Sequence, residues 1–138
     1  DNANLSESAV TALQNKLTGC TISHSELKRS IELGGESFLS DSETVEAKGL
    51  DLSDISAVSG FSAVKHLDLS DNKISNLSAL SGLKTLETLD LRNNKISDVT
   101  ALSGLTNLKQ LWLGGNELSG DQIDALKKAL PNCYISVE

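Results

Sequence analysis

Aromatic residues, cysteine, proline and clustered basic residues are all scarce in this chain of 138 residues. Aromatic residues make up 3% of the chain, and there are two cysteines, one proline and no methionine. Because hydrophobic residues still account for 38%, the core must be built from Leu, Ile, Val and Ala, which suits thin, repeated layers. The length is sufficient for one domain. A chain that starts at Asp1 and lacks Met is expected to have a trimmed N-terminus.

Charge and hydropathy argue against nucleic acid and against membranes as partners. The net charge is −7 and the pI is about 4.8, and Lys and Arg occur singly or in pairs. An acidic domain repels phosphate backbones, so we expect no nucleic-acid binding. No apolar run is long enough to span a bilayer, so we expect no membrane insertion.

The sequence contains no motif for catalysis or for metal binding. There is no nucleophile elbow, phosphate loop or calcium loop. His24 and His66 have no cysteine or carboxylate at metal-ligand spacing. We therefore expect no catalytic residue, no metal site and no cofactor, and a hydrolytic enzyme is the least favoured alternative.

The chain does have an internal repeat with a period of 22 residues. Two series of apolar residues follow it, Leu67, Leu89, Leu111 and Cys133 in one and Leu69, Leu91, Leu113 and Ile135 in the other. The pattern L-x-x-L-x-L-x-x-N-x-L/I at this period is the signature of a leucine-rich repeat solenoid. Each coil opens with a strand, because apolar residues alternate there. The leucines of the return path are three apart, which predicts a tight 3₁₀ turn.

Both ends of the chain follow the same register. Aligning Cys133 with Leu111 predicts a last strand there, and Cys20 at a matching position predicts a first strand. Helices are predicted over Ala9 to Leu17 and between Ser119 and Pro131, where serine caps and proline terminates. We predict an α/β leucine-rich repeat solenoid with a parallel sheet of about six strands on its concave face and helical caps at both ends.

The single domain, residues 1–138, then divides into three parts. These are an N-terminal capping unit (1–44), regular repeats (45–117) and a C-terminal capping unit (118–138). The first regular coil is degenerate, with Val45 and Ala47 at the leucine positions and Leu50 at the asparagine position. Within the N-terminal unit, Gly34-Gly35 favours a hairpin that places Ile31 opposite Phe38. A short helix over Glu26 to Ile31 is the competing interpretation.

The two cysteines fall on core positions of the first and last predicted strands. Five strand spacings would separate them by roughly 24 Å. A disulfide needs Cα atoms within about 7 Å, so we predict no intramolecular bridge.

One asparagine in each regular coil is predicted to be structural. Such an amide can satisfy backbone groups of two adjacent coils at once, which would make a hydrogen-bonded ladder. The ladder comprises Asn72, Asn94 and Asn116.

The strand residues between the core leucines form three outward columns on the open face of the sheet. The columns are Thr44, His66, Thr88, Gln110; Glu46, Asp68, Asp90, Trp112; and Lys48, Ser70, Arg92, Gly114. We assign partner binding to eight of them: His66, Asp68, Ser70, Thr88, Asp90, Arg92, Gln110 and Trp112. Trp and Arg are the types most enriched at binding hot spots. Two structural alternatives stay open, namely a Trp112 that lies over its neighbours and an Arg92 that pairs with Asp68 or Asp90.

The coils from Val64 to Asn116 resemble bacterial internalin-type leucine-rich repeats of the form LxxLxLxxNxIS-x-x-x-x-L-x-x-L. The closing ALKKALPNCYISV looks like the terminal unit of bacterial leucine-rich repeat proteins. The resemblance implies a secreted or cell-surface bacterial protein that binds a protein or peptide ligand on its concave sheet. By that resemblance Asp68, Asp90, Arg92 and Trp112 match the binding columns. The sequence differs from the family in its small number of coils.

The size of the sheet limits this function. A face of six strands is roughly 25–30 Å long, and a standard interface buries about 800 Å² per partner, so a partner would also touch the flanking loops or bind weakly. We expect a monomer. The alternative is a structural unit that assembles by stacking through its caps.

Overall fold

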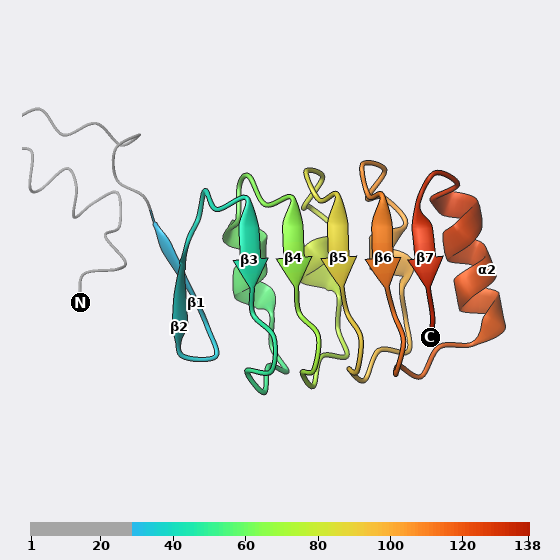
Figure 1. The fold of residues 1–138 in the computed structure, drawn as a ribbon, viewed down its shortest axis with the longest axis horizontal. Helices are drawn as coiled ribbons and strands as arrows, with labels where there is room; N and C mark the ends of the chain where they lie inside the picture. The colour runs from blue at the N-terminus through green and yellow to red at the C-terminus, as the bar shows by residue number, and fades with distance from the viewer. Residues whose placement is uncertain (1–28) are drawn as a thin grey trace, which may run out of the picture.

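Five parallel strands lie side by side in chain order and form one face of the molecule in Figure 1. The structure is a computed structural model, and it describes residues 29–138. The strands are β3 (Thr44–Glu46), β4 (His66–Asp68), β5 (Thr88–Asp90), β6 (Gln110–Trp112) and β7 (Tyr134–Ser136). This is the parallel sheet of a leucine-rich repeat solenoid, as predicted.

Short 3₁₀ turns form the layer behind the sheet (Figure 1). They are η2 (Ser56–Gly60), η3 (Ser78–Leu80) and η4 (Thr100–Leu102), and they confirm the predicted tight return. A side-chain oxygen accepts the N–H of the first residue of each turn at 2.9 Å. The acceptors belong to Asp54, Asn76 and Asp98, and the donors are Ser56, Ser78 and Thr100. These contacts hold the return path in place, since Asp and Asn readily bond the backbone two residues ahead.

The core lies between the sheet and the 3₁₀ turns. Leu89 and Leu91 reach it from β5 and its following residue, and Leu102 and Leu105 reach it from the return path, all fully buried. Because successive coils repeat these positions, each layer of leucines packs on the layer before it. Burial of one such side chain stabilises the fold by about 1.5–3 kcal/mol.

A β-hairpin precedes the sheet. Strands β1 (Ser30–Leu33) and β2 (Glu36–Leu39) pair antiparallel, with Ile31 opposite Phe38. The turn needs two residues with positive φ, and Gly34 and Gly35 supply them at +58° and +88°. The predicted hairpin is therefore confirmed, and the competing helix is not formed at Ser30 and Ile31.

The C-terminal coil contains the helix α2 (Gly120–Ala129). Ser119 is its N-cap, and its hydroxyl accepts the Gln122 N–H at 3.4 Å. The buried Leu126 and Leu130 attach this coil to the core. Among residues 29–138, no helix is long and apolar enough to cross a membrane.

The predicted register of the last strand is wrong by two residues. Ile135, not Cys133, lies opposite Leu111, so this coil is 24 residues long instead of 22. Cys133 precedes β7 and is half-buried. A shift of two residues keeps every side chain on its own face, so alternation could not distinguish the two registers. The longer coil follows from its return path, which is an α-helix instead of a 3₁₀ turn.

Three predictions depend on residues outside the described range. These are the first strand at Cys20, the absence of a bridge between Cys20 and Cys133, and the helix over Ala9 to Leu17. Of the roughly six strands that the sequence predicts, the described residues therefore contain five.

Candidate binding site on the open face of the sheet

After each of the strands β3 to β6, one residue with a left-handed backbone conformation turns the chain. Gly49, Asp71, Asn93 and Gly115 have φ values of +68°, +56°, +55° and +73°, and they recur at the repeat period. Gly, Asn and Asp adopt this conformation most readily. Their recurrence every 22 residues is visible in the sequence, but the pattern of leucines and ladder asparagines does not include it. The turn directs the next residue, the ladder asparagine in the regular coils, inward.

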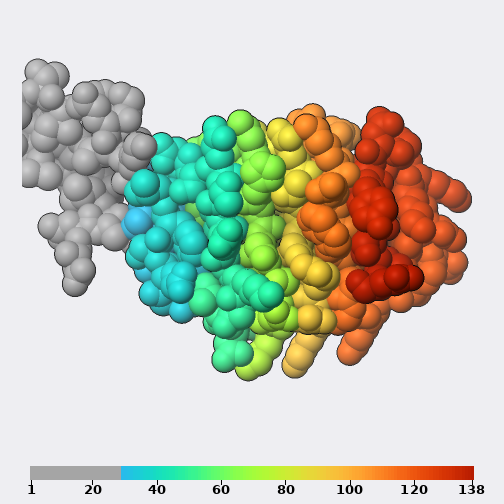
Figure 2. Space-filling model, viewed as in Figure 1, coloured from blue at the N-terminus to red at the C-terminus, as the bar shows by residue number. Residues whose placement is uncertain are grey.

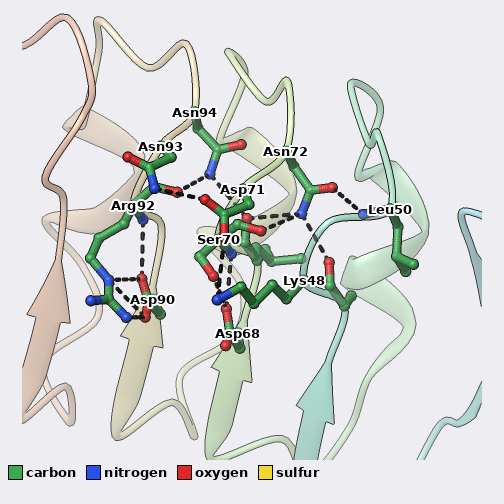
Figure 3. A network of polar contacts seen from close by, with 12 residues as sticks. Lys48, Leu50, Asp68, Ser70, Asp71, Asn72, Asp90, Arg92, Asn93 and Asn94 are labelled. Carbon is green, nitrogen blue, oxygen red and sulfur yellow. Dashed lines mark hydrogen bonds and ion pairs between the residues drawn. The ribbon is translucent and has the colours of Figure 1, made fainter.

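The asparagines bridge neighbouring coils, as Figure 3 shows for Asn72 and Asn94. The Oδ1 atom of Asn72 accepts the N–H groups of Leu50 and Leu52 at 3.0 Å. Its Nδ2 donates to the Ala47 carbonyl at 2.9 Å and to the Leu69 carbonyl at 3.0 Å. Asn72 thus bonds the coil that precedes its own, even though that coil has Leu50 at its ladder position.

The same arrangement recurs at the next two steps. Asn94 accepts the Ile74 N–H at 3.0 Å and donates to the Leu69 carbonyl at 3.0 Å. Asn116 accepts the Ile96 N–H at 3.1 Å and donates to the Leu91 carbonyl at 2.8 Å. The amides hold the coils at constant spacing, which aligns the outward columns of the sheet.

The open face presents these columns in register across the strands. His66 pairs with Thr88, Asp68 with Asp90, and Asp90 with Trp112. Figure 2 shows this face, with successive coils as adjacent bands from cyan to red. The corrected register adds Tyr134 beside Gln110, and this residue is 65% exposed. The prediction omitted Tyr134, although its place between Cys133 and Ile135 gave it the outward parity.

The acidic column is organised by short-range hydrogen bonds. Asp90 pairs with Arg92, whose Nε lies 3.0 Å from Oδ1 and whose Nη2 lies 2.5 Å from Oδ2 (Figure 3). Of the two carboxylates considered as partners of Arg92, Asp90 is therefore the one that pairs with it. The hydrogen bonds that Arg92 donates to Asp90, and the negative charge of that carboxylate, raise the pKa of Arg92 above its usual range. Arg92 thus stays charged, and it neutralises a carboxylate whose side chain is only 12% exposed.

Asp68 uses one carboxylate oxygen differently. Its Oδ1 accepts the Ser70 N–H at 2.9 Å and the Ser70 hydroxyl at 2.6 Å. Ser70 is only 2% exposed, so it presents little surface to a partner and orients Asp68 instead. His66 Nδ1 lies 2.8 Å from the Thr88 hydroxyl, which joins the first column in the same way.

An open hollow of about 180 Å³ lies on this face. It is lined by Thr44, Val45, Glu46, His66, Leu67, Asp68, Thr88, Asp90 and Trp112. At roughly 30 Å³ per molecule it has room for about six waters. Trp112 is half-buried and borders the hollow from β6, so it combines packing with an exposed surface.

The described residues also bear on other chemistry. Residues 29–138 contain no group of three or more His, Cys, Asp or Glu side chains that could hold a metal ion. Cys133 is a free thiol in that range, and burial raises its pKa above the usual value. A raised pKa leaves less of the reactive thiolate near neutral pH.

Comparison with known proteins agrees with the geometry. The family described as Leucine Rich repeats (2 copies) matches residues 62–104 and 84–128. The described part of the chain folds as a leucine-rich repeat solenoid. Its repeats are of the bacterial internalin type, since internalin C2 of Listeria monocytogenes is 29% identical with a TM-score of 0.65. That similarity covers 74% of this chain and 42% of internalin C2. No curated protein matches the sequence.

Two further solved structures are similar to this solenoid. An internalin, InlF, of Listeria monocytogenes is 24% identical with a TM-score of 0.63, covers 74% of this chain and 31% of its own, and shows the fold alone. A leucine-rich repeat protein of Leptospira interrogans is 29% identical with a TM-score of 0.56 and covers 61% of this chain and 22% of its own. The chain spans less than half the length of each. The fold and family support a protein-interaction module, and leucine-rich repeat proteins of this kind are typically not enzymes.

Proposed function

We propose that this chain binds a protein or peptide partner on the open, concave face of its sheet. The observation that carries the proposal is the half-buried Trp112 beside the hollow on that face. The residue is not needed by the core, which is complete with Leu111 and Leu113 on the other side of β6. A large aromatic side chain in a partly enclosed position is typical of a binding hot spot.

Seven of the eight assigned residues form the contact surface in this proposal. They are His66, Asp68, Thr88, Asp90, Arg92, Gln110 and Trp112, while Ser70 orients Asp68 from a buried position. Tyr134 extends the surface along β7. The similarity to internalins supports action outside a bacterial cell, secreted or at its surface. We propose that the chain acts there as a monomer.

A crosslinking experiment tests the proposal. A photoreactive amino acid is placed at Gln110 on the sheet face or at Ala57 on η2, behind the core, in the otherwise unchanged chain. Specific capture is expected from position 110 alone, and the additional Trp112→Ala substitution should abolish it. Equal capture from both positions, or capture that ignores Trp112→Ala, would contradict binding at this face.

A further inference from the structure

Four basic side chains border the open face, and each is already paired with a carboxylate. Lys48 lies 3.2 Å from Asp71, Lys65 lies 3.2 Å from Glu43 and Lys109 lies 2.6 Å from Glu87. Arg92 is paired with Asp90, as described above. Each of these side chains thus has a carboxylate of its own at ion-pair distance, and the charge of Arg92 reaches Asp68 only from farther away.

Two carboxylates of the hollow remain without an ion pair among residues 29–138. Glu46 on β3 is exposed, and Asp68 on β4 uses its Oδ1 atom for Ser70. The two residues are in register on adjacent strands, so their backbones are about 4.8 Å apart. Their negative charges add at this end of the hollow and favour a cation there.

The opposite border of the hollow is aromatic. Trp112 follows Asp68 and Asp90 in the same column. The hollow thus offers a cation two carboxylates at one end and an apolar wall at the other. Lys and Arg side chains match this arrangement, because each has an apolar stem and a charged head. Arg has the additional ability to bond two carboxylates through its planar fork.

We infer that the partner places one basic side chain, Arg or Lys, in this hollow. Its charged head lies at Glu46 and Asp68, and its stem lies against Trp112. The inference rests on the proposed function and specifies the chemistry that the face recognises. Neutral or acidic side chains are disfavoured there, since they would leave the Glu46 and Asp68 charges without a partner.

Selection of peptides on the intact chain tests the inference. Random dodecapeptides displayed on phage are selected on residues 1–138, and the selected peptides are synthesised. Trp112 is the only Trp in the chain, so 5-fluorotryptophan reports contact at this face through one ¹⁹F signal. Each Arg is then replaced by citrulline and each Lys by acetyl-lysine, which are neutral and similar in shape.

We expect peptides that shift the ¹⁹F signal to contain a basic residue whose neutral replacement weakens binding about 10- to 100-fold. The variant Glu46→Gln/Asp68→Asn should weaken the original peptide similarly and then be insensitive to the replacement. Glu36→Gln/Asp124→Asn removes the same charges from exposed sites off the face, and it should bind as the unchanged chain does.

Three results would overturn the inference. Peptides could shift the Trp112 signal without a basic residue, or keep their sensitivity to citrulline in the Glu46→Gln/Asp68→Asn variant. In both of these cases binding at the face itself, and so the proposed function, would stand. In the third, no selected peptide shifts the Trp112 signal. That result would reject a basic side chain in the hollow, and the crosslinking at Gln110 would still test the proposed function.

Discussion

The two sides of the parallel sheet follow opposite rules. On the core side the same residue recurs at each step, as Leu67, Leu89 and Leu111 do in strands β4 to β6. On the open side the in-register column changes from Glu46 through Asp68 and Asp90 to Trp112. Packing between identical coils demands repetition, because each layer must fit the next at close-packed density.

The difference separates what holds the molecule together from what it can recognise. The inward side chains and the asparagine ladder are constrained by neighbouring coils, whereas the outward side chains are not part of the apolar core. Substitutions of adjacent residues in one strand should therefore lower the free energy of unfolding by very different amounts.

The largest effect is expected on the core side of β5. Leu89→Ala removes a fully buried side chain and should lower the free energy of unfolding by about 2–5 kcal/mol, because a cavity remains where the leucine packed. Urea denaturation measures this, with the neighbouring Thr88→Ala on the open face as the control. A loss for Leu89→Ala no larger than that for Thr88→Ala would remove the distinction between the two sides.

The ladder should come next. Asn94→Ala leaves the buried Ile74 N–H without its acceptor and removes one of the two amide donors of the Leu69 carbonyl, the other being Asn72. It should lower the free energy of unfolding by about 1–3 kcal/mol. The control is Asn93→Gly, which keeps the positive φ that Gly49 and Gly115 adopt in the same column. Denaturation in urea should show a clear loss for the first variant and little change for the second. The reverse order would mean that the turn, not the amide, holds the coils.

Trp112→Ala should have a small effect on stability and a large one on binding. Trp112 is half-buried and outside the core, so its removal should cost no more than about 1 kcal/mol. Its sequence neighbour provides the contrast, since Leu111→Ala should cost about 2–5 kcal/mol. Thermal unfolding of the two variants decides the point. Equal destabilisation would place Trp112 in the core and weaken its assignment to a binding surface.

The smallest effect concerns acid stability. The Thr100 N–H and hydroxyl bond the Asp98 carboxylate and hold its pKa below the usual range. A carboxyl group with a lowered folded-state pKa adds stability above its unfolded pKa of about 3.9, and this is lost as the pH falls through the folded value. Asp98→Asn keeps the acceptor oxygen, so it should flatten the loss of stability below about pH 4.

The equivalent position of the preceding coil offers the reciprocal test. Asn76 makes the same 2.9 Å contact with an amide oxygen, and Asn76→Asp should steepen the loss of stability in acid. Urea midpoints at pH 7 and pH 3 measure both changes. If both variants lost the same stability between pH 7 and pH 3 as the unchanged chain does, these turns would not contribute to its acid sensitivity.

Most of the fold was predictable because repetition made one inference serve several coils. The strands, the 3₁₀ turns and the hairpin at Gly34-Gly35 follow from local spacing and from residues with special backbone conformations. The last strand was placed two residues early, because alternation has the same phase after a shift of two. The length of the C-terminal coil depended on α2, whose path the 22-residue period does not describe.

The candidate face was predictable only as a set of positions. Sequence parity places Asp68, Asp90 and Trp112 on one side of the sheet, but it does not tell which of the two carboxylates pairs with Arg92. In the structure Asp90 takes that partner and Asp68 accepts two hydrogen bonds from Ser70. Local geometry made this choice, since Arg92 lies two residues after Asp90, on the same face of the same coil.

The sequence by itself determined which residues stack, because a 22-residue period with alternating apolar positions assigns each residue to the core, the ladder or the open face. Only the tertiary structure decided which charges neutralise one another across coils and which carboxylates remain unpaired beside Trp112. Ion pairing depends on distances of a few ångströms between side chains of different coils. A repeat length sets the order of the coils but not those distances.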